Sequence, residues 1–252
     1  MKIKKINANL SNLYLLKDCG LIIKQLKDSP EWIRGGIVVA TQDERIKNSI
    51  AAYKNFPKLF PKIKLFANKT YIREFVDSST LEENPNKLEN VLEKLFTMHQ
   101  EGIAKVKKEK NIKIQSLGEL WKSGYRLFGN FLNLKNFDSA TSILTYNVGD
   151  AKESNLLSDS EYITFDAEGF GIGDISTDIV ALIESFQYHK KPELFEKTLN
   201  LISKKYSALD KNIIKKSLLG LIGIRALEVI AEERNKNLFD EAIELFKKFK
   251  DK

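Results

Sequence analysis

The stretch ILTYNVGDAKESNLLSDSEYITFDAEGFGIGDISTDIV, residues 143–180, holds most of the polar side chains that define a possible site. Its apolar start runs into a loop that carries Asp150 and Asn155. A Ser-Asp-Ser turn follows, and a strand expected over Tyr162–Phe165 ends at Asp166. The pattern predicts a hairpin that brings the three polar side chains to one edge.

The three side chains Asp150, Asn155 and Asp166 offer oxygen ligands. Such ligands suit Mg²⁺, a hard cation that is usually held by one or two carboxylates together with substrate phosphates. The remaining carboxylate can orient a hydroxyl nucleophile, which completes the layout of a phosphoryl-transfer site. Asp, Asn and Ser are also common turn residues. The order, the spacing and the intervening strand together favour the site over a set of unrelated turns.

These motifs resemble the aminoglycoside phosphotransferase and choline kinase family, which has the protein-kinase fold. Gly149-Asp150 with Asn155 is similar to the catalytic loop of that family, and Asp166-Ala167-Glu168 is similar to its metal-binding Asp-x-Glu. Gly173-Asp174 and Asp178 extend the resemblance, whose specific part covers residues 148–178. It implies an α+β, two-lobed protein-kinase-like fold, with a small strand-rich N-terminal lobe and a larger helical C-terminal lobe.

The resemblance also implies a role for each matching residue. Asp150 would be the catalytic base, and Asn155 and Asp166 would be the Mg²⁺ ligands. Glu168 would be a further acidic group near the metal, and Asp178 would brace the catalytic loop.

Two further positions of this loop bear on the comparison with the family. Lys152 stands two residues after Asp150, as in protein Ser/Thr kinases, where it would steady the γ-phosphate; the alternative is a solvated loop lysine. Val148 occupies the position where the family usually has His, and this departure bears on how the loop is braced.

Residues 1–76 are expected to form the N-terminal nucleotide-binding lobe. Two apolar runs, residues 13–16 and 21–23, flank a turn that contains Gly20, which predicts a hairpin. By the resemblance, residues 9–12 fall in the phosphate-covering loop, and this loop contains no glycine. Lys24 falls where the third-strand lysine of the family contacts phosphates; an ordinary solvated lysine is the alternative.

The segment Thr41-Gln42-Asp43-Glu44 is a capping box that predicts the start of a helix. Glu44 is one candidate for the helix glutamate that pairs with the lysine in the family. The paired glutamate usually lies about one turn later, and a glutamate at this position of a capping box also has a purely structural role. Both interpretations of Glu44 stay open at this point.

The segment 71–76 is similar to the hinge strand between the two lobes of the family. Backbone groups of Glu74 and Val76 would meet the adenine there. Backbone recognition leaves little trace in a sequence, and an ordinary edge strand is the alternative interpretation.

Residues 77–252 are expected to form the helical C-terminal lobe that contains the catalytic loop. Apolar residues recur at helical spacing from residue 85 onward, and His99 lies on the first apolar stripe, which predicts a core position for it. Further helices are expected over residues 116–134, 174–188, 192–206, 212–233 and 237–249.

Composition narrows the class of protein. The chain has 252 residues, 42% hydrophobic and 30% charged, as is typical of a soluble globular protein. Its net charge of +7 is diffuse, and the absence of a zinc spacing or an aromatic-rich basic motif argues against a nucleic-acid partner. The single cysteine cannot form an intramolecular disulfide, and no apolar run reaches 18 residues. These features predict a cytoplasmic protein without a membrane partner.

The leading functional hypothesis is an ATP-dependent kinase that uses Mg²⁺ and acts on a hydroxyl of a small-molecule acceptor. An atypical protein Ser/Thr kinase is an alternative, although only residues 167–177 separate Asp166 from Asp178, which leaves little room for a regulated activation segment. A nucleotide-binding pseudokinase is a second alternative, suggested by the glycine-free loop and Val148. A dinucleotide-binding enzyme has only residues 169–173 in its favour, where the third glycine comes one position early.

Overall fold

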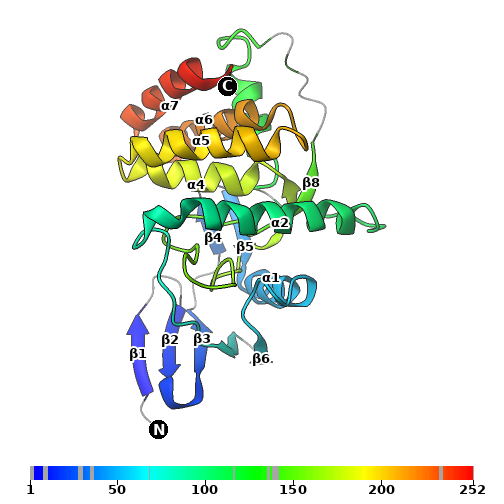
Figure 1. Cartoon of the computed structure of the whole chain (residues 1–252), viewed down its shortest axis with the longest axis vertical. Coiled ribbons are helices and arrows are strands. Elements are labelled where there is room, and N and C mark those ends of the chain that lie inside the picture. Colours follow the sequence, from blue (N-terminus) through cyan, green and yellow to red (C-terminus); the bar gives the residue numbers. More distant parts are fainter. Residues whose placement is uncertain are drawn as a thin grey trace.

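A computed structural model describes residues 3–7, 11–27, 31–34, 37–67, 69–115, 117–134, 137, 142–232 and 235–251. Helix α2 crosses the molecule between a strand-rich N-terminal part and a stack formed by helices α4 to α7 (Figure 1). This arrangement agrees with the expected α+β architecture.

The N-terminal part contains a five-stranded antiparallel sheet with the strand order β1-β2-β3-β7-β6. Its strands are β1 (Ile3–Asn7), β2 (Ser11–Leu16), β3 (Leu21–Leu26), β6 (Ile63–Ala67) and β7 (Thr70–Glu74). The predicted hairpin between β2 and β3 is confirmed, and Gly20 in its turn has φ +59°. Residues 9 and 10 of the expected phosphate-covering loop lie outside the described residues.

A smaller pair of strands, β4 (Glu31–Arg34) and β5 (Ile37–Thr41), leads into helix α1 (Gln42–Asn55). The capping box predicted at the start of this helix is confirmed. The Thr41 hydroxyl accepts a hydrogen bond from Glu44 N, and the Glu44 carboxylate accepts one from Thr41 N.

The C-terminal part is mainly helical. Its regular elements are the 3₁₀ turn η2 (Pro85–Lys87), α2 (Leu88–Val106), α3 (Leu120–Phe128), β8 (Leu144–Asn147), β9 (Gly171–Asp174), α4 (Thr177–Tyr188), α5 (Pro192–Tyr206), α6 (Ile213–Glu232) and α7 (Lys236–Phe249).

The strand predicted over Tyr162–Phe165 is wrong. That segment forms only a single bridge between Leu156 and Thr164, and β8 pairs with β9 instead. The helix predicted over residues 116–134 is shorter than expected, since α3 covers only Leu120–Phe128. The helical boundaries after residue 176 agree with the prediction to within about three residues.

The core of the C-terminal part lies among α2, α4, α5 and α6. Trp121 is completely buried there, and α6 is buried around most of its circumference because it packs against α3, α4, α5 and α7. Helix α3 lies against the backbone of α6 at Gly124, where an added Cβ would lie 2.0 Å from Leu219 O. Glycine at this position therefore sets the distance between the two helices.

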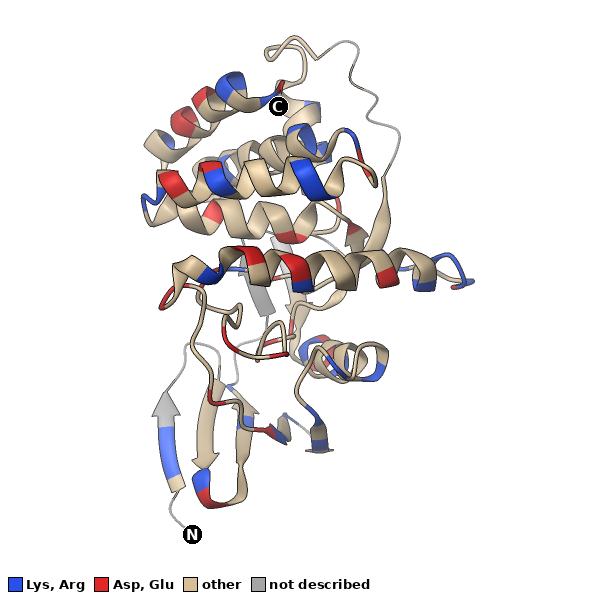
Figure 2. Ribbon diagram, viewed as in Figure 1, with Lys and Arg blue, Asp and Glu red and all other residues tan. Residues whose placement is uncertain are grey.

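Charged residues of both signs lie along α5 and α7, which are among the outer helices (Figure 2). Diffuse charge of this kind is typical of solvated helix faces. Among the described residues, no helix is both long and apolar enough to cross a membrane.

Candidate active site

The loop that carries Asp150 begins at a glycine that the geometry requires. Gly149 has φ +84°, and a Cβ at this position would lie 1.8 Å from Gly169 O. The start of the loop therefore rests directly on the backbone of the turn that follows Asp166. A side chain at residue 149 would separate these two segments, which carry the predicted base and the predicted metal ligand.

Asp178 of helix α4 braces the same loop, as the resemblance implied. Its two carboxylate oxygens accept hydrogen bonds from Val148 N and Gly149 N, both at 2.8 Å. His99 of α2 lies 3.1 Å from Asp178 through Nε2, and its Nδ1 lies 3.0 Å from Tyr206 OH. Because backbone N–H groups supply the bracing, it does not require a histidine at residue 148. The predicted core position of His99 is confirmed, since its side chain is fully buried.

Three predicted residues meet within the loop itself. Asn155 donates from Nδ2 to Asp150 Oδ2 and to Asp150 O, both at 3.0 Å. Lys152 Nζ lies 3.3 Å from Asp150 Oδ1, and both side chains remain partly exposed. These contacts hold the Asp150 carboxylate from inside the loop while one side of it still meets solvent.

Thr164 links this loop to Asp166 and was not predicted. Its buried hydroxyl donates to Asn155 O at 2.8 Å and accepts from Asp166 N at 3.0 Å. A single side chain therefore fixes the distance between the segments of Asn155 and Asp166. The sequence shows only a threonine in an apolar run, which gives no signal for this role.

Asp166 has the properties of a cation ligand. Lys24 Nζ lies 3.0 Å from its Oδ2, whereas its Oδ1 is buried and has no hydrogen-bond partner among the described residues. Burial alone would raise the pKa of Asp166, but the charges of Lys24 and then Arg73 outweigh burial and hold the pKa below its usual value. Buried carboxylate oxygens normally have partners, and an anionic oxygen without one fits a hard cation such as Mg²⁺.

Glu168 has a different environment from Asp166. Lys24 Nζ lies 2.8 Å from its Oε1, and Arg45 of α1 donates to its Oε2 through Nε at 2.8 Å and Nη2 at 2.5 Å. Cations therefore engage both oxygens of Glu168 in this structure, and its expected place near the metal stays a prediction. Arg45 was not predicted, because an arginine inside a helix has no distinctive sequence signal.

The pairing of Glu44 with Lys24 is wrong. Glu44 caps α1 and also forms an exposed ion pair with Lys113 at 3.1 Å, whereas the described partners of Lys24 are Asp166 and Glu168. The capping alternative accounts for Glu44. Lys24 is almost fully buried, so the alternative of an ordinary solvated lysine does not hold either.

The predicted hinge residues lie at the end of β7. Glu74 N donates to Lys62 O, and Glu74 O accepts from Arg73 Nη1, both at 3.0 Å. Val76 follows the strand and is half-buried. The backbone N–H of Glu74 is thus already used within the sheet, and its carbonyl oxygen, which has two lone pairs, can still accept a second bond.

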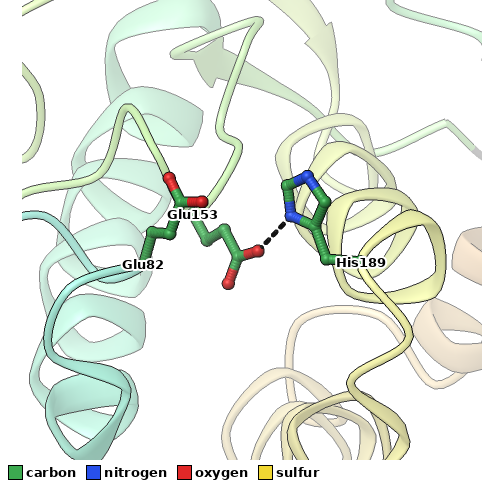
Figure 3. A group of neighbouring side chains, drawn as sticks. All are labelled: Glu82, Glu153 and His189. Atoms are coloured by element: carbon green, nitrogen blue, oxygen red, sulfur yellow. Dashed lines mark hydrogen bonds and ion pairs between the residues drawn. The ribbon is translucent and has the colours of Figure 1, made fainter.

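Glu153 ties the loop to the turn after α4 (Figure 3). Its fully buried carboxylate lies 2.5 Å from His189 Nδ1 through Oε1 and 2.8 Å from Lys191 Nζ through Oε2. Glu82 lies close enough for the three side chains Glu82, Glu153 and His189 to resemble a metal-ligand set. Because Lys191 and His189 already engage the Glu153 carboxylate, we interpret this group as a polar anchor of the loop.

A lysine also anchors the segment between Asn155 and Asp166. Lys94 of α2 donates from Nζ to three backbone carbonyls, those of Leu157, Ser160 and Tyr162, at 2.6, 2.9 and 3.0 Å. Burial lowers the pKa of Lys94 to about 8, and Asp159 acts in the opposite direction. The cost of burying the ammonium therefore offsets part of the gain from its hydrogen bonds.

Lys94→Met is expected to lower the free energy of unfolding by about 1 to 3 kcal/mol, because methionine has a similar length but leaves the three carbonyls without their donor. Urea denaturation measures this loss. Lys87→Met, at a more exposed lysine near the start of the same helix, is the control and should change stability by less than about 0.5 kcal/mol. Equal losses in the two variants would contradict the anchoring role of Lys94.

Several solved structures share the fold of this chain. A thermostable mutant of aminoglycoside phosphotransferase APH(4)-Ia is 11% identical, with 99% of this chain and 94% of that chain covered and a TM-score of 0.62. Choline kinase from Cryptosporidium parvum Iowa II is 16% identical, with 99% and 89% covered and a TM-score of 0.59. Choline kinase LicA from Streptococcus pneumoniae is 14% identical, with 99% and 94% covered and a TM-score of 0.59.

At such low identities the likeness establishes the fold. The two-lobed, kinase-like α+β fold that the sequence predicted is therefore confirmed. No protein-family model matches the sequence, and no curated protein matches it.

Proposed function

We propose that the protein is an ATP-dependent kinase that transfers phosphate to a hydroxyl group of a small molecule with the help of Mg²⁺. The observation that carries this proposal is the Asp166 carboxylate. One of its oxygens is paired with Lys24, and the other is buried without a partner among the described residues. A phosphate-binding cation and a metal-binding anion are thereby brought together, with Asp150 and Asn155 on the adjoining loop.

Each residue has a defined part in the proposed reaction. Lys24 binds phosphate oxygens of the nucleotide, and Asp166 and Asn155 hold Mg²⁺. When bound, Mg²⁺ neutralises charge on the phosphates. Asp150 orients the acceptor hydroxyl and takes its proton as the acceptor oxygen bonds to the γ-phosphorus and the bond from that phosphorus to the β-γ bridging oxygen breaks. Lys152, beside Asp150, steadies the γ-phosphate.

A small-molecule acceptor is favoured over a protein acceptor. Residues 167–177 pass directly from Asp166 through β9 to α4, so the segment that carries regulation in protein kinases has little length here. The similar structures described above are of aminoglycoside and choline kinases, which act on small molecules according to their names. We also propose that residues 1–76 form the nucleotide-binding lobe, in a cytoplasmic protein.

ATP and Mg²⁺ together are expected to stabilise the protein against heat. At a nucleotide concentration about a hundredfold above its dissociation constant, the gain in unfolding free energy is roughly 2.7 kcal/mol. For a chain of this size that gain corresponds to a rise in Tm of about 5 to 10 °C. Differential scanning fluorimetry with ATP, GTP and ADP, each with and without Mg²⁺, measures the shift. If no purine nucleotide moves the Tm, the proposal is wrong.

A further inference from the structure

Helix α1 approaches the candidate nucleotide site with a cation and an amide. Arg45 and Asn48 stand three residues apart, so they share one face of the helix. Arg45 donates through Nε and Nη2 to Glu168 Oε2, and Asn48 Nδ2 donates to Glu168 O at 2.9 Å. The helix therefore holds both the side chain and the backbone of Glu168.

The other oxygen of Glu168 holds Lys24. The side chains of Arg45, Glu168 and Lys24 are only 2%, 8% and 7% exposed, so each depends on its neighbours for charge compensation. Lys24 Nζ lies 2.8 Å from Glu168 Oε1 and 3.0 Å from Asp166 Oδ2, so the position of its ammonium group depends on Glu168 as well as on Asp166.

We propose that Arg45 is a positioning residue for nucleotide phosphates, because it fixes Glu168 and Glu168 in turn fixes the ammonium group of Lys24. This inference rests on the proposed function. It assigns the positioning of Lys24 to Arg45 and Glu168, whereas the resemblance led us to consider a glutamate of α1 for that role. Neither carboxylate of α1 is in a position to do it, because Glu44 caps the helix and Asp43 is exposed; one turn after Glu44 stands Asn48.

The balance of charge gives the reason for an arginine at this place. Three cations, Lys24, Arg45 and Arg73, interact with two carboxylates, Asp166 and Glu168. The excess of positive charge favours an anion such as phosphate. Without Arg45 the excess disappears, and Glu168 draws the ammonium of Lys24 more strongly to itself. Phosphate then has to compete with Glu168 for Lys24.

Isothermal titration calorimetry with Mg-ATP and with adenosine tests this inference without any acceptor. Arg45→Met should raise the Kd of Mg-ATP roughly tenfold, a typical size for coupling through neighbouring residues. The Kd of adenosine, which has no phosphate, should change less than about twofold. In a Glu168→Gln background, Arg45→Met should have little further effect on Mg-ATP, since Arg45 acts through Glu168.

Arg225→Met is the matched control, because Arg225 is also a fully buried arginine and its ion pairs, with Glu184 and Glu228, involve no residue of the proposed reaction. It should lower the Tm without raising the Kd of Mg-ATP. If either methionine variant fails to fold, Arg45→Lys and Arg225→Lys replace the pair. Arg45→Lys should still raise the Kd because lysine cannot reproduce both donors, but by a smaller factor because it keeps the positive charge.

The outcomes separate the inference from the proposed function. Equal losses for Mg-ATP and adenosine, or a full effect of Arg45→Met in the Glu168→Gln background, would show that Arg45 is only structural. An unchanged Kd in a folded Arg45 variant would overturn the inference and leave the kinase proposal standing. A wild type that binds no nucleotide would overturn both.

Discussion

Asp150→Asn is expected to lower turnover by roughly 10² to 10⁴ while the fold and nucleotide binding are kept, because the amide retains the shape of the side chain and loses the ability to accept a proton. The surroundings favour retention of the fold. Asn155 and Lys152 contact the Asp150 side chain, which remains partly exposed, so an altered hydrogen-bond pattern there can be completed by water. Steady-state kinetics on an acceptor, with Tm and the Kd of Mg-ATP measured in parallel, provide the test.

Asp159→Asn is the matched control for this variant. Asp159 is an exposed carboxylate on the segment between Asn155 and Asp166, and its contacts are to Ser158, Asn84 and Lys87. Its neutralisation should leave kcat within about twofold of the wild type, as for most surface substitutions. If Asp150→Asn turns over at the wild-type rate, Asp150 is not the base.

Asp166→Ala is expected to abolish the Mg²⁺ dependence of nucleotide binding. It removes the buried oxygen that has no described partner, and with it the anion proposed to hold Mg²⁺. The apparent affinity for Mg²⁺ should fall by at least about a hundredfold, since changes even in the outer shell of a metal site cost 10- to 100-fold. Titration of Mg²⁺ at constant ATP, followed by the Tm, measures this loss.

Glu168→Gln tests whether Asp166 or Glu168 is the carboxylate on which Mg²⁺ binding depends. Both oxygens of Glu168 are held by Lys24 and Arg45, so this variant should bind ATP more weakly but keep its dependence on Mg²⁺. Loss of the Mg²⁺ dependence in Glu168→Gln, with its retention in Asp166→Ala, would reverse the assignment.

The contacts within the loop could be predicted from the sequence because they join neighbouring residues. Asp150, Lys152 and Asn155 lie within six positions, so a short motif already fixes their mutual geometry. Asp178 was predicted through the resemblance, and its carboxylate braces the loop through two backbone N–H groups. The side chain of residue 148 takes no part in these hydrogen bonds. A valine at this position is therefore compatible with the bracing of the loop.

The long-range partners could not be predicted in the same way. Arg45 and Glu168 are separated by 123 positions, and no local pattern links an arginine inside a helix with a glutamate after a turn. The segment 162–165 is a short run of aromatic and β-branched residues, which is typical of a strand. Lys94 instead binds the Tyr162 carbonyl together with those of Leu157 and Ser160 just before the segment, and only one bridge forms. Tertiary hydrogen bonds replaced the strand pairing that the local sequence favoured.

The most direct test of the central claim is the transfer of labelled γ-phosphate from ATP, with Mg²⁺, to a panel of sugars, amino alcohols, amino acids and nucleosides, with generic protein substrates in parallel. The proposed function predicts a labelled small-molecule product with the wild type and with Asp159→Asn, and a reduction of roughly 10² to 10⁴ in its rate of formation with Asp150→Asn. A wild type that binds Mg-ATP but labels no acceptor would instead indicate a nucleotide-binding pseudokinase, and label in protein alone would indicate a protein kinase.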